Sequence, residues 1–341
     1  IKLARQYHVA KGESSRYRIL SRFPSYHGST LGALSATGYL TLNQPFEPLL
    51  YEQQHIPAPT CYRCPYNKSY PDCGVACAEE LETLIQNLGP ETVAAFMLEP
   101  IGGASTAAIV PPDDYFGIIT QICRKYGILL IYDEVMTGVS RTGKFCAYQH
   151  WPEAEVDILV LAKGLGAGYS PLGAVVCRPE ISDAVLAAGG FRHGYTYAGN
   201  PLSCAVGLEA LKIIDDEQLC ENATLQGNRL KEGLQQLQSN YSFIGDVRGK
   251  GLLLGVEVVA DREMKEPFPA SWDVYQVITR FAFEEGLIIY PRRNFAGIKG
   301  DHVLIAPPLI ITGDEVEALL ERFEKALKKL EDWINSPHTN P

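Results

Sequence analysis

Two short apolar runs in the middle of the chain end in side chains of opposite charge. Ile128–Tyr132 is followed by Asp133, and Ile158–Ala162 is followed by Lys163. If both runs are parallel strands, their carboxyl ends meet at one edge of a sheet, where α/β proteins bind their ligands. A salt bridge at the sheet edge would explain the same pair, and strand position alone does not decide between the two.

The residues after Lys163 favour a binding site over a salt bridge. Gly164, Gly166 and Gly168 would let a bulky group approach the lysine closely. Desolvation lowers the pKa of a lysine and makes it a nucleophile, and a carboxylate can hold the protonated ring nitrogen of a pyridine cofactor. The pair is therefore typical of pyridoxal-phosphate chemistry, with Lys163 as the Schiff-base residue and Asp133 at the ring nitrogen.

The elements that must position these residues alternate between strands and helices. Val93–Leu98 and Leu172–Cys177 are further strand candidates, and apolar periodicity predicts helices over residues 112–126 and 200–214. Because parallel strands need crossover connections, this alternation indicates an α/β fold with a central, mostly parallel sheet.

The pattern changes after a long polar helix expected over residues 219–238. The elements expected beyond it are strands at residues 251–259, 287–290 and 303–306 and helices at residues 274–285 and 314–333. Strands followed by helices indicate a smaller α+β domain. We expect a large domain over residues 1–240, a small C-terminal domain over residues 241–335 and a tail over residues 336–341.

Composition narrows the classes of function. The 341 residues include 30 basic and 40 acidic side chains, a formal charge of −10, which argues against non-specific nucleic-acid binding. No apolar run reaches the roughly 18 residues that a membrane span needs. The nine cysteines are an odd number, and in a large α/β chain they favour free thiols in a reducing, cytoplasmic setting.

Longer segments around both charged residues resemble the class III aminotransferases, the family of omega-amine and ornithine-type transaminases. Residues 129–143 resemble the family's ring-binding segment, and residues 157–165 resemble its lysine segment. Further matches follow in the family's order at Tyr26–Gly28, Glu99–Pro100, residues 196–201 and residues 306–309. One match would be weak evidence, but together they cover nearly the whole chain.

The resemblance implies a fold of type I, in which a large domain with a seven-stranded, mostly parallel sheet carries pyridoxal 5'-phosphate beside a small α+β domain. Lys163 would bind the cofactor and shuttle the substrate proton, and Asp133 would pair with the ring nitrogen. Val135 would pack on one face of the ring and Tyr26 on the other, with His27 close by.

The resemblance also implies two contacts with the phosphate group of the cofactor. Thr196 would reach the phosphate of the neighbouring subunit's cofactor, which implies a homodimer with a shared active site. The family's main phosphate loop lies at a helix N-terminus and would precede residue 1. Because Ile1–Tyr7 reads as the middle of a helix without a cap residue, we expect a natural N-terminal segment to be missing.

Substrate preference depends on a few positions. Ornithine- and GABA-type members carry a Glu–Arg gate for 2-oxoglutarate, and its two positions hold Ala104 and Leu304 here. The chain instead resembles the omega-amine branch, in part of which a mobile arginine binds the substrate carboxylate at the position of Gly297. Arg292 and Arg293 could replace that arginine, because the guanidinium fork binds two oxygens at once. Two solvated loop arginines explain the sequence equally well.

The predicted function is therefore transamination by a ping-pong mechanism. An omega-amine or amino acid would donate the amino group, and a small oxo acid such as pyruvate would accept it. Another pyridoxal-phosphate reaction on the same fold, as in an aminomutase or a decarboxylase, is the first alternative. A non-catalytic binding subunit is the second. We expect no nucleic-acid or membrane partner.

A cysteine cluster is left over. Cys61, Cys64, Cys73 and Cys77 fall within seventeen residues, and the first pair has the two-residue spacing common in zinc sites. The second pair is spaced by three residues. We expect free thiols packed in an insertion and no metal, with a structural zinc ion as the alternative.

Overall fold

Six strands form the larger sheet of the computed structural model, which describes residues 1–51 and 54–336. Their order is β2 (His55–Pro57), β1 (Arg18–Phe23), β3 (Val93–Leu98), β4 (Leu129–Asp133), β5 (Ile158–Leu161) and β6 (Ala174–Cys177). All neighbouring pairs are parallel except β5 and β6. The mostly parallel sheet is as predicted, but the described residues contribute six strands to it instead of seven.

Helices cover both faces of this sheet because side chains alternate between the faces along each strand. Phe96 and Leu98 of β3 face one side, where α4 (Ala76–Leu88) and α5 (Tyr115–Tyr126) complete a core. Ala95 and Met97 face the other side, where α1 (Lys2–Ala10) and α6 (Pro179–Ala187) pack. Buried on both faces, β3 and β4 read as continuous apolar runs.

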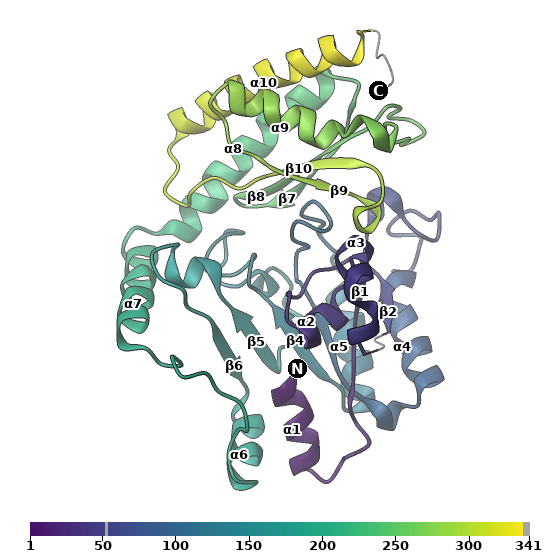
Figure 1. Cartoon of the computed structure of the whole chain (residues 1–341), viewed down its shortest axis with the longest axis vertical. Helices are drawn as coiled ribbons and strands as arrows, with labels where there is room; N and C mark the ends of the chain where they lie inside the picture. The colour runs from purple at the N-terminus through teal and green to yellow at the C-terminus, as the bar shows by residue number, and fades with distance from the viewer. Residues whose placement is uncertain (52–53, 337–341) are drawn as a thin grey trace.

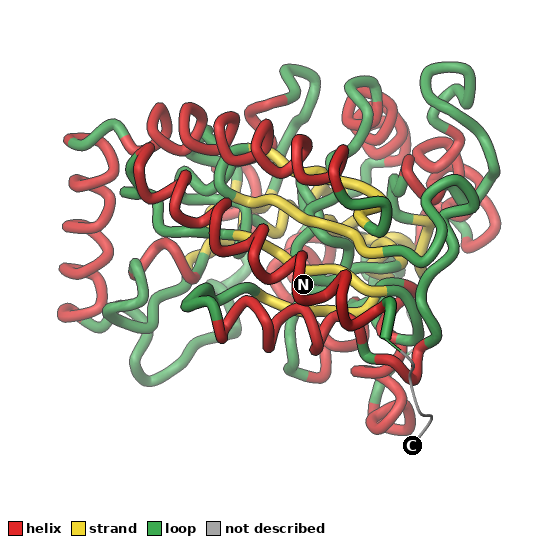
Figure 2. Tube along the Cα trace, turned by 90° about the horizontal axis from the view of Figure 1, so that it is seen from above, coloured by secondary structure: helices red, strands yellow, loops and turns green. Residues whose placement is uncertain are grey.

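The smaller sheet has four antiparallel strands and lies above the larger one (Figure 1). Its order is β7 (Ile244–Lys250), β8 (Leu253–Val258), β10 (Asp301–Ile305) and β9 (Tyr290–Arg293). Three helices pack over it, as Figure 2 shows from above: α8 (Leu219–Asn240), α9 (Val274–Glu284) and α10 (Gly313–Ile334). A separate hydrophobic core joins these helices to the sheet.

Most predicted elements are present, and the differences have physical causes. Strands β1, β2 and β7 were missed, and the strand predicted at residues 287–290 is instead β9, which starts at Tyr290. Strand β7 alternates buried apolar residues with charged ones, so it contains no apolar run. The remaining helices are α2 (Leu31–Ala36), α3 (Leu40–Asn43) and α7 (Pro201–Asp216).

The structure bears only in part on the predicted domain boundary and on the predicted C-terminal tail. Helix α8 ends at Asn240 and β7 begins at Ile244, so the predicted boundary between two domains falls in a connection. The division into domains stays a prediction. Of the predicted tail, residues 337–341 lie outside the described residues. No described helix is long and apolar enough to cross a membrane.

Candidate active site

Asp133 and Lys163 lie at the same edge of the larger sheet. Asp133 is the last residue of β4, and Lys163 follows β5 after one alanine. The two strands are parallel neighbours in which Asp133 is paired with Val160. Both side chains line one cavity of about 620 Å³. The structure therefore brings together the two residues whose strand positions suggested chemistry.

Asp133 is buried and held by two neighbours. Its Oδ2 lies 2.9 Å from Nδ1 of His27, and its Oδ1 accepts a hydrogen bond from the Val135 backbone N–H at 3.2 Å. The side chain of His27 is fully buried, and its Nε2 has no hydrogen-bond partner among the described residues. The aspartate is thus fixed in orientation, and the histidine beside it keeps one ring nitrogen for a further partner.

Lys163 begins a short 3-10 helix, η5 (Lys163–Gly166), in an unusual backbone conformation. Its φ of 46° lies in the left-handed region, which costs a non-glycine residue on the order of 1 kcal/mol and is often found at functional sites. Partial burial lowers the pKa of the lysine, while the carboxylates of Asp133 and Glu99 oppose this shift. A lowered pKa increases the neutral, nucleophilic fraction of the amine.

Glu99 is a cavity residue to which the sequence interpretation gave no role. It follows β3 directly, is buried, and accepts hydrogen bonds from the backbone N–H groups of Gly103 at 2.9 Å and Tyr26 at 3.3 Å. Burial raises the pKa of its carboxyl group, and the charges of His27 and Arg22 counteract this in part. The signal was a third apolar strand ending in a charged residue, as for Asp133 and Lys163.

Glycine at position 103 is required by this arrangement. A Cβ atom there would lie 2.9 Å from Oε1 of Glu99 and 2.8 Å from the Sδ atom of Met136. Such distances are shorter than van der Waals contact, so a larger residue would push the loop away from both side chains. Gly103 therefore keeps the loop after β3 close to the cavity wall.

The other predicted site residues separate into two groups. Tyr26, His27, Val135 and Arg292 line the cavity with Asp133 and Lys163. Thr196 lies in the exposed segment between α6 and α7 and does not line it. Arg293 also lies outside the lining, and its guanidinium forms an ion pair with Asp273.

Ala104 and Leu304, at which the resemblance predicted the positions of a Glu–Arg gate, both line the cavity, so the cavity wall is apolar at these two positions. Behind this wall, Nε2 of the fully buried His302 lies 2.8 Å from the carbonyl oxygen of Ala104. Burial lowers the pKa of His302 to about 4. A neutral His302 that donates from Nε2 thus fixes the loop carrying Ala104, a role that sequence reasoning missed.

These residues fit pyridoxal phosphate. Asp133 offers a carboxylate for the ring nitrogen, Lys163 offers an amine for the aldehyde carbon, and Tyr26 and Val135 offer surfaces for the ring. The unpartnered Nε2 of the buried His27 adds a polar group at the same end as Asp133. The cavity volume of about 620 Å³ lies within the range of cofactor sites.

The four clustered cysteines form a different feature. Cys61, Cys64, Cys73 and Cys77 are all free thiols, and they line one small cavity of about 20 Å³ beside α4. Burial raises the pKa of the Cys77 thiol to about 12. Within residues 1–51 and 54–336, no three His, Cys, Asp or Glu side chains are arranged to hold a metal ion.

Comparison with known proteins identifies the relatives of the chain. The sequence model of the family described as "Aminotransferase class-III" matches residues 1–327. The uncharacterized aminotransferase YodT of Bacillus subtilis is 40% identical over 335 residues, which are 97% of this chain and 74% of YodT. The probable gamma-aminobutyrate transaminase 3, mitochondrial, of Oryza sativa subsp. indica is 36% identical, and the chain spans only 64% of its length.

Solved structures agree with these relatives. An amine transaminase from an uncultivated Pseudomonas species, in its PLP-bound form, superimposes with a TM-score of 0.90 at 36% identity, over 96% of this chain and 73% of that protein. A thermostable (S)-enantioselective omega-transaminase from Thermomicrobium roseum gives a TM-score of 0.89 at 40% identity, over 96% of this chain and 71% of that protein.

Proposed function

Because the chain belongs to the class-III aminotransferase family, which uses pyridoxal phosphate, we propose that it transfers an amino group from an omega-amine or amino acid to a small oxo acid such as pyruvate. The observation that carries this proposal is the convergence of Asp133 and Lys163 on one cavity at the ends of adjacent parallel strands. The relatives described above, an amine transaminase and a probable gamma-aminobutyrate transaminase, support the substrate class.

The cofactor would be held by the residues that line the inner end of the cavity. Asp133 would pair with the ring nitrogen, and Tyr26 and Val135 would enclose the ring. His27 would keep Asp133 in place through the contact of 2.9 Å between Nδ1 and Oδ2. When bound, the cofactor supplies an electron sink for the negative charge that develops on the substrate carbon.

Lys163 would do the proton transfer. Its amine lies in the same cavity as Asp133, and its lowered pKa increases the fraction of the neutral form, which can accept a proton from the substrate carbon. The same Nζ atom, once protonated, could then donate this proton to the carbon atom of the cofactor that carries the amino group. One side chain can therefore carry the proton in both half-reactions of a ping-pong cycle.

Arg292 would bind the carboxylate of the oxo acid. It lines the cavity, and Nη2 donates to the hydroxyl of Tyr290 at 2.7 Å, which leaves the rest of the guanidinium fork for a ligand. Because Ala104 and Leu304 make part of the cavity wall apolar, a second carboxylate would find no partner there. This favours pyruvate and similar monocarboxylates over 2-oxoglutarate as acceptors.

We extend the proposal to a cytoplasmic homodimer in which Thr196 of one subunit reaches the cofactor phosphate of the other. Support comes from the exposure of the segment that carries Thr196: Tyr195 and Tyr197 beside it are 72% and 81% exposed. Large exposed aromatic side chains are common in protein interfaces. Sedimentation of the protein tests the oligomer, and the affinity for pyridoxal phosphate with and without a Thr196→Ala change tests the cofactor contact.

The experiment that tests the function supplies each half-reaction alone. With cofactor present, an omega-amine donor should remove the visible absorbance of the aldehyde form, and pyruvate should restore it. Loss of carbon dioxide, or an amino group moved within the donor, would indicate decarboxylase or aminomutase chemistry instead. If borohydride attaches no cofactor to the peptide containing Lys163, the non-catalytic binding subunit becomes the better interpretation.

A further inference from the structure

A second cavity of about 620 Å³ lies where β7 of the small sheet faces the segment Pro59–Pro65 and the loop after β3. We call it the junction cavity. Among the residues that the structure describes, Ser105 alone lines both this cavity and the cofactor cavity. The two cavities have the same volume, and the proposed transamination uses only the cofactor cavity.

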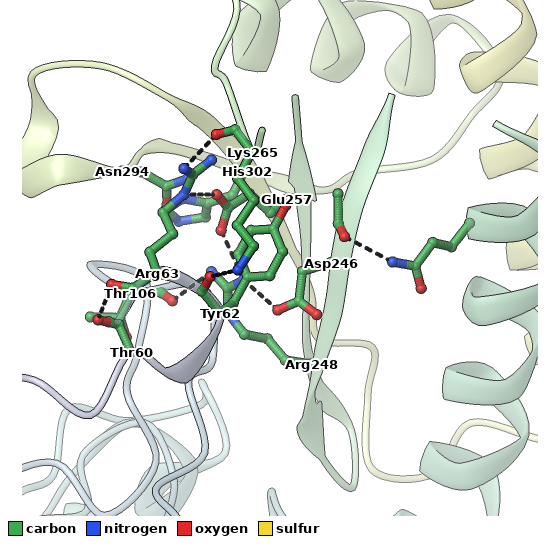
Figure 3. A network of polar contacts seen from close by, with 12 residues as sticks. Thr60, Tyr62, Arg63, Thr106, Asp246, Arg248, Glu257, Lys265, Asn294 and His302 are labelled. Carbon is green, nitrogen blue, oxygen red and sulfur yellow. Dashed lines mark hydrogen bonds and ion pairs between the residues drawn. The ribbon is translucent and has the colours of Figure 1, made fainter. Parts of the chain in front are cut away.

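One wall of the junction cavity is a network of ion pairs in which positive and negative charges are equal in number (Figure 3). The buried Glu257 accepts hydrogen bonds from Nε of Arg63 at 2.5 Å and Nη1 of Arg248 at 2.8 Å. Arg248 also pairs with Asp246 at 2.8 Å. Burial raises the pKa of Glu257, but the two arginines more than offset this and hold it below its ordinary value. Two arginines and two carboxylates balance, so this wall needs no ligand charge.

Two further cations at the cavity have no such balance. Lys231 of α8 and Lys250 at the end of β7 both line it, and neither forms an ion pair with any residue in 1–51 or 54–336. Burial, and then the charge of Lys250, lower the pKa of Lys231, while the charge of Asp246 opposes them. The ammonium of Lys231 donates one hydrogen bond, to the Gly249 carbonyl oxygen at 3.1 Å. Two neighbouring ammonium groups repel each other, so an anion bound between them would be stabilised.

Hydrogen-bond donors at the same cavity are also unsatisfied. The Tyr62 hydroxyl and the Ser105 hydroxyl are buried and have no partner in the described part of the chain. Ser105 is only 4% exposed. Buried polar groups are nearly always paired, so donors without partners beside a cavity indicate a ligand that brings acceptor oxygens.

Thr60 and Thr106 are further polar residues of the lining, and much of the rest is apolar and includes the side chains of Phe23, Pro24, Pro59, Ile109, Val247 and Phe295. A cavity of this size with a mostly apolar wall and a few polar groups is typical of small-molecule sites. We propose that the junction cavity binds a small organic anion, with its acidic group at Lys231 and Lys250 and its apolar body against this wall.

Calorimetry on the full chain, saturated with pyridoxal phosphate to fill the cofactor cavity, tests this site with 4-phenylbutyrate as the probe. We expect saturable binding, and about tenfold weaker binding of the neutral 4-phenylbutanamide, because a charged group in contact with ammonium contributes more than a neutral one. Lys231→Met and Lys250→Met, made separately, should each weaken binding of the carboxylate by about tenfold. The exposed Lys328→Met on α10 should leave it unchanged.

Three outcomes would overturn the proposal. The first is absence of binding at roughly 10 mM probe, where any functional small-molecule site should be occupied. The second is unchanged affinity in whichever lysine variants keep the wild-type circular dichroism. The third is binding of inorganic phosphate as tight as that of 4-phenylbutyrate, because a simple anion gains nothing from the apolar wall.

Discussion

Arg292 and Arg293 are consecutive residues of β9 and face different surroundings. Arg292 lines the cofactor cavity, whereas the guanidinium of Arg293 binds Asp273 outside it. The cause is the strand itself, because successive side chains of a β-strand point to opposite faces. The sequence offered the two arginines as equal candidates for the substrate carboxylate, and strand geometry separates them.

The first prediction uses this pair as its own control. Arg292→Met should raise KM for pyruvate by roughly ten- to a hundredfold, because the carboxylate loses a charged, forked donor. Arg293→Met should leave KM nearly unchanged, since its side chain does not line the cavity. Steady-state kinetics over a range of pyruvate concentrations measures both. An equal rise of KM in the two variants would contradict the assignment of Arg292.

The second prediction concerns Lys163. Lys163→Ala should lower turnover by at least about a thousandfold, because no other group remains to take the proton. The fold should persist, since the side chain lies at the cavity and leaves the hydrophobic cores intact. Single-turnover rates measure the loss of the lysine amine, and added methylamine should restore part of it by acting as a free base in place of that amine. Turnover near the wild-type rate would remove Lys163 from the mechanism.

The third prediction concerns Asp133. Asp133→Asn should lower kcat by about a hundredfold or more, because an amide is a weaker partner than a carboxylate for a protonated ring nitrogen. The exposed Asp183→Asn on α6 changes charge equally and should have no effect. Comparing kcat of the two variants separates the local role of Asp133 from the general effect of charge. Similar kcat values in both would refute the assignment.

The parts of the site that could be predicted are those encoded locally. Strands β3, β4 and β5 are buried on both faces or nearly so, and they read as apolar runs whose ends are marked by charge. Parallel pairing then places those ends at one edge of the sheet, so the convergence of Asp133 and Lys163 follows from the pattern. The same logic applied to β3 would have found Glu99.

Other parts depend on contacts that no local pattern contains. Strand β1 was missed because arginines interrupt its apolar residues, and the buried Arg22 among them donates to the Glu99 carbonyl oxygen. His302 contacts Ala104 across 198 positions of the sequence. The seventh strand of the large sheet was expected from the family resemblance alone. The large sheet formed by the described residues has six strands.

The last prediction follows from His302. Burial lowers its pKa from 6.5 to about 4, so between these values the unfolded chain binds a proton that the folded protein does not. Protons therefore favour the unfolded state in this interval, and the contribution of His302 to the free energy of unfolding rises with pH by about 3 kcal/mol. The contribution is complete above pH 6.5 and is lost as the pH falls toward 4.

Asp301 beside it acts in the opposite direction over nearly the same interval, because burial raises its pKa to about 6. The test therefore compares the pH dependence of stability in the wild type with that in a His302 variant. Urea unfolding at about pH 4.5 and 7.5 should show a smaller loss of stability on acidification for His302→Gln than for the wild type, since glutamine does not titrate. The exposed His193→Gln should behave like the wild type. If His302→Gln loses as much stability as the wild type on acidification, His302 is not the buried neutral histidine that holds the Ala104 loop.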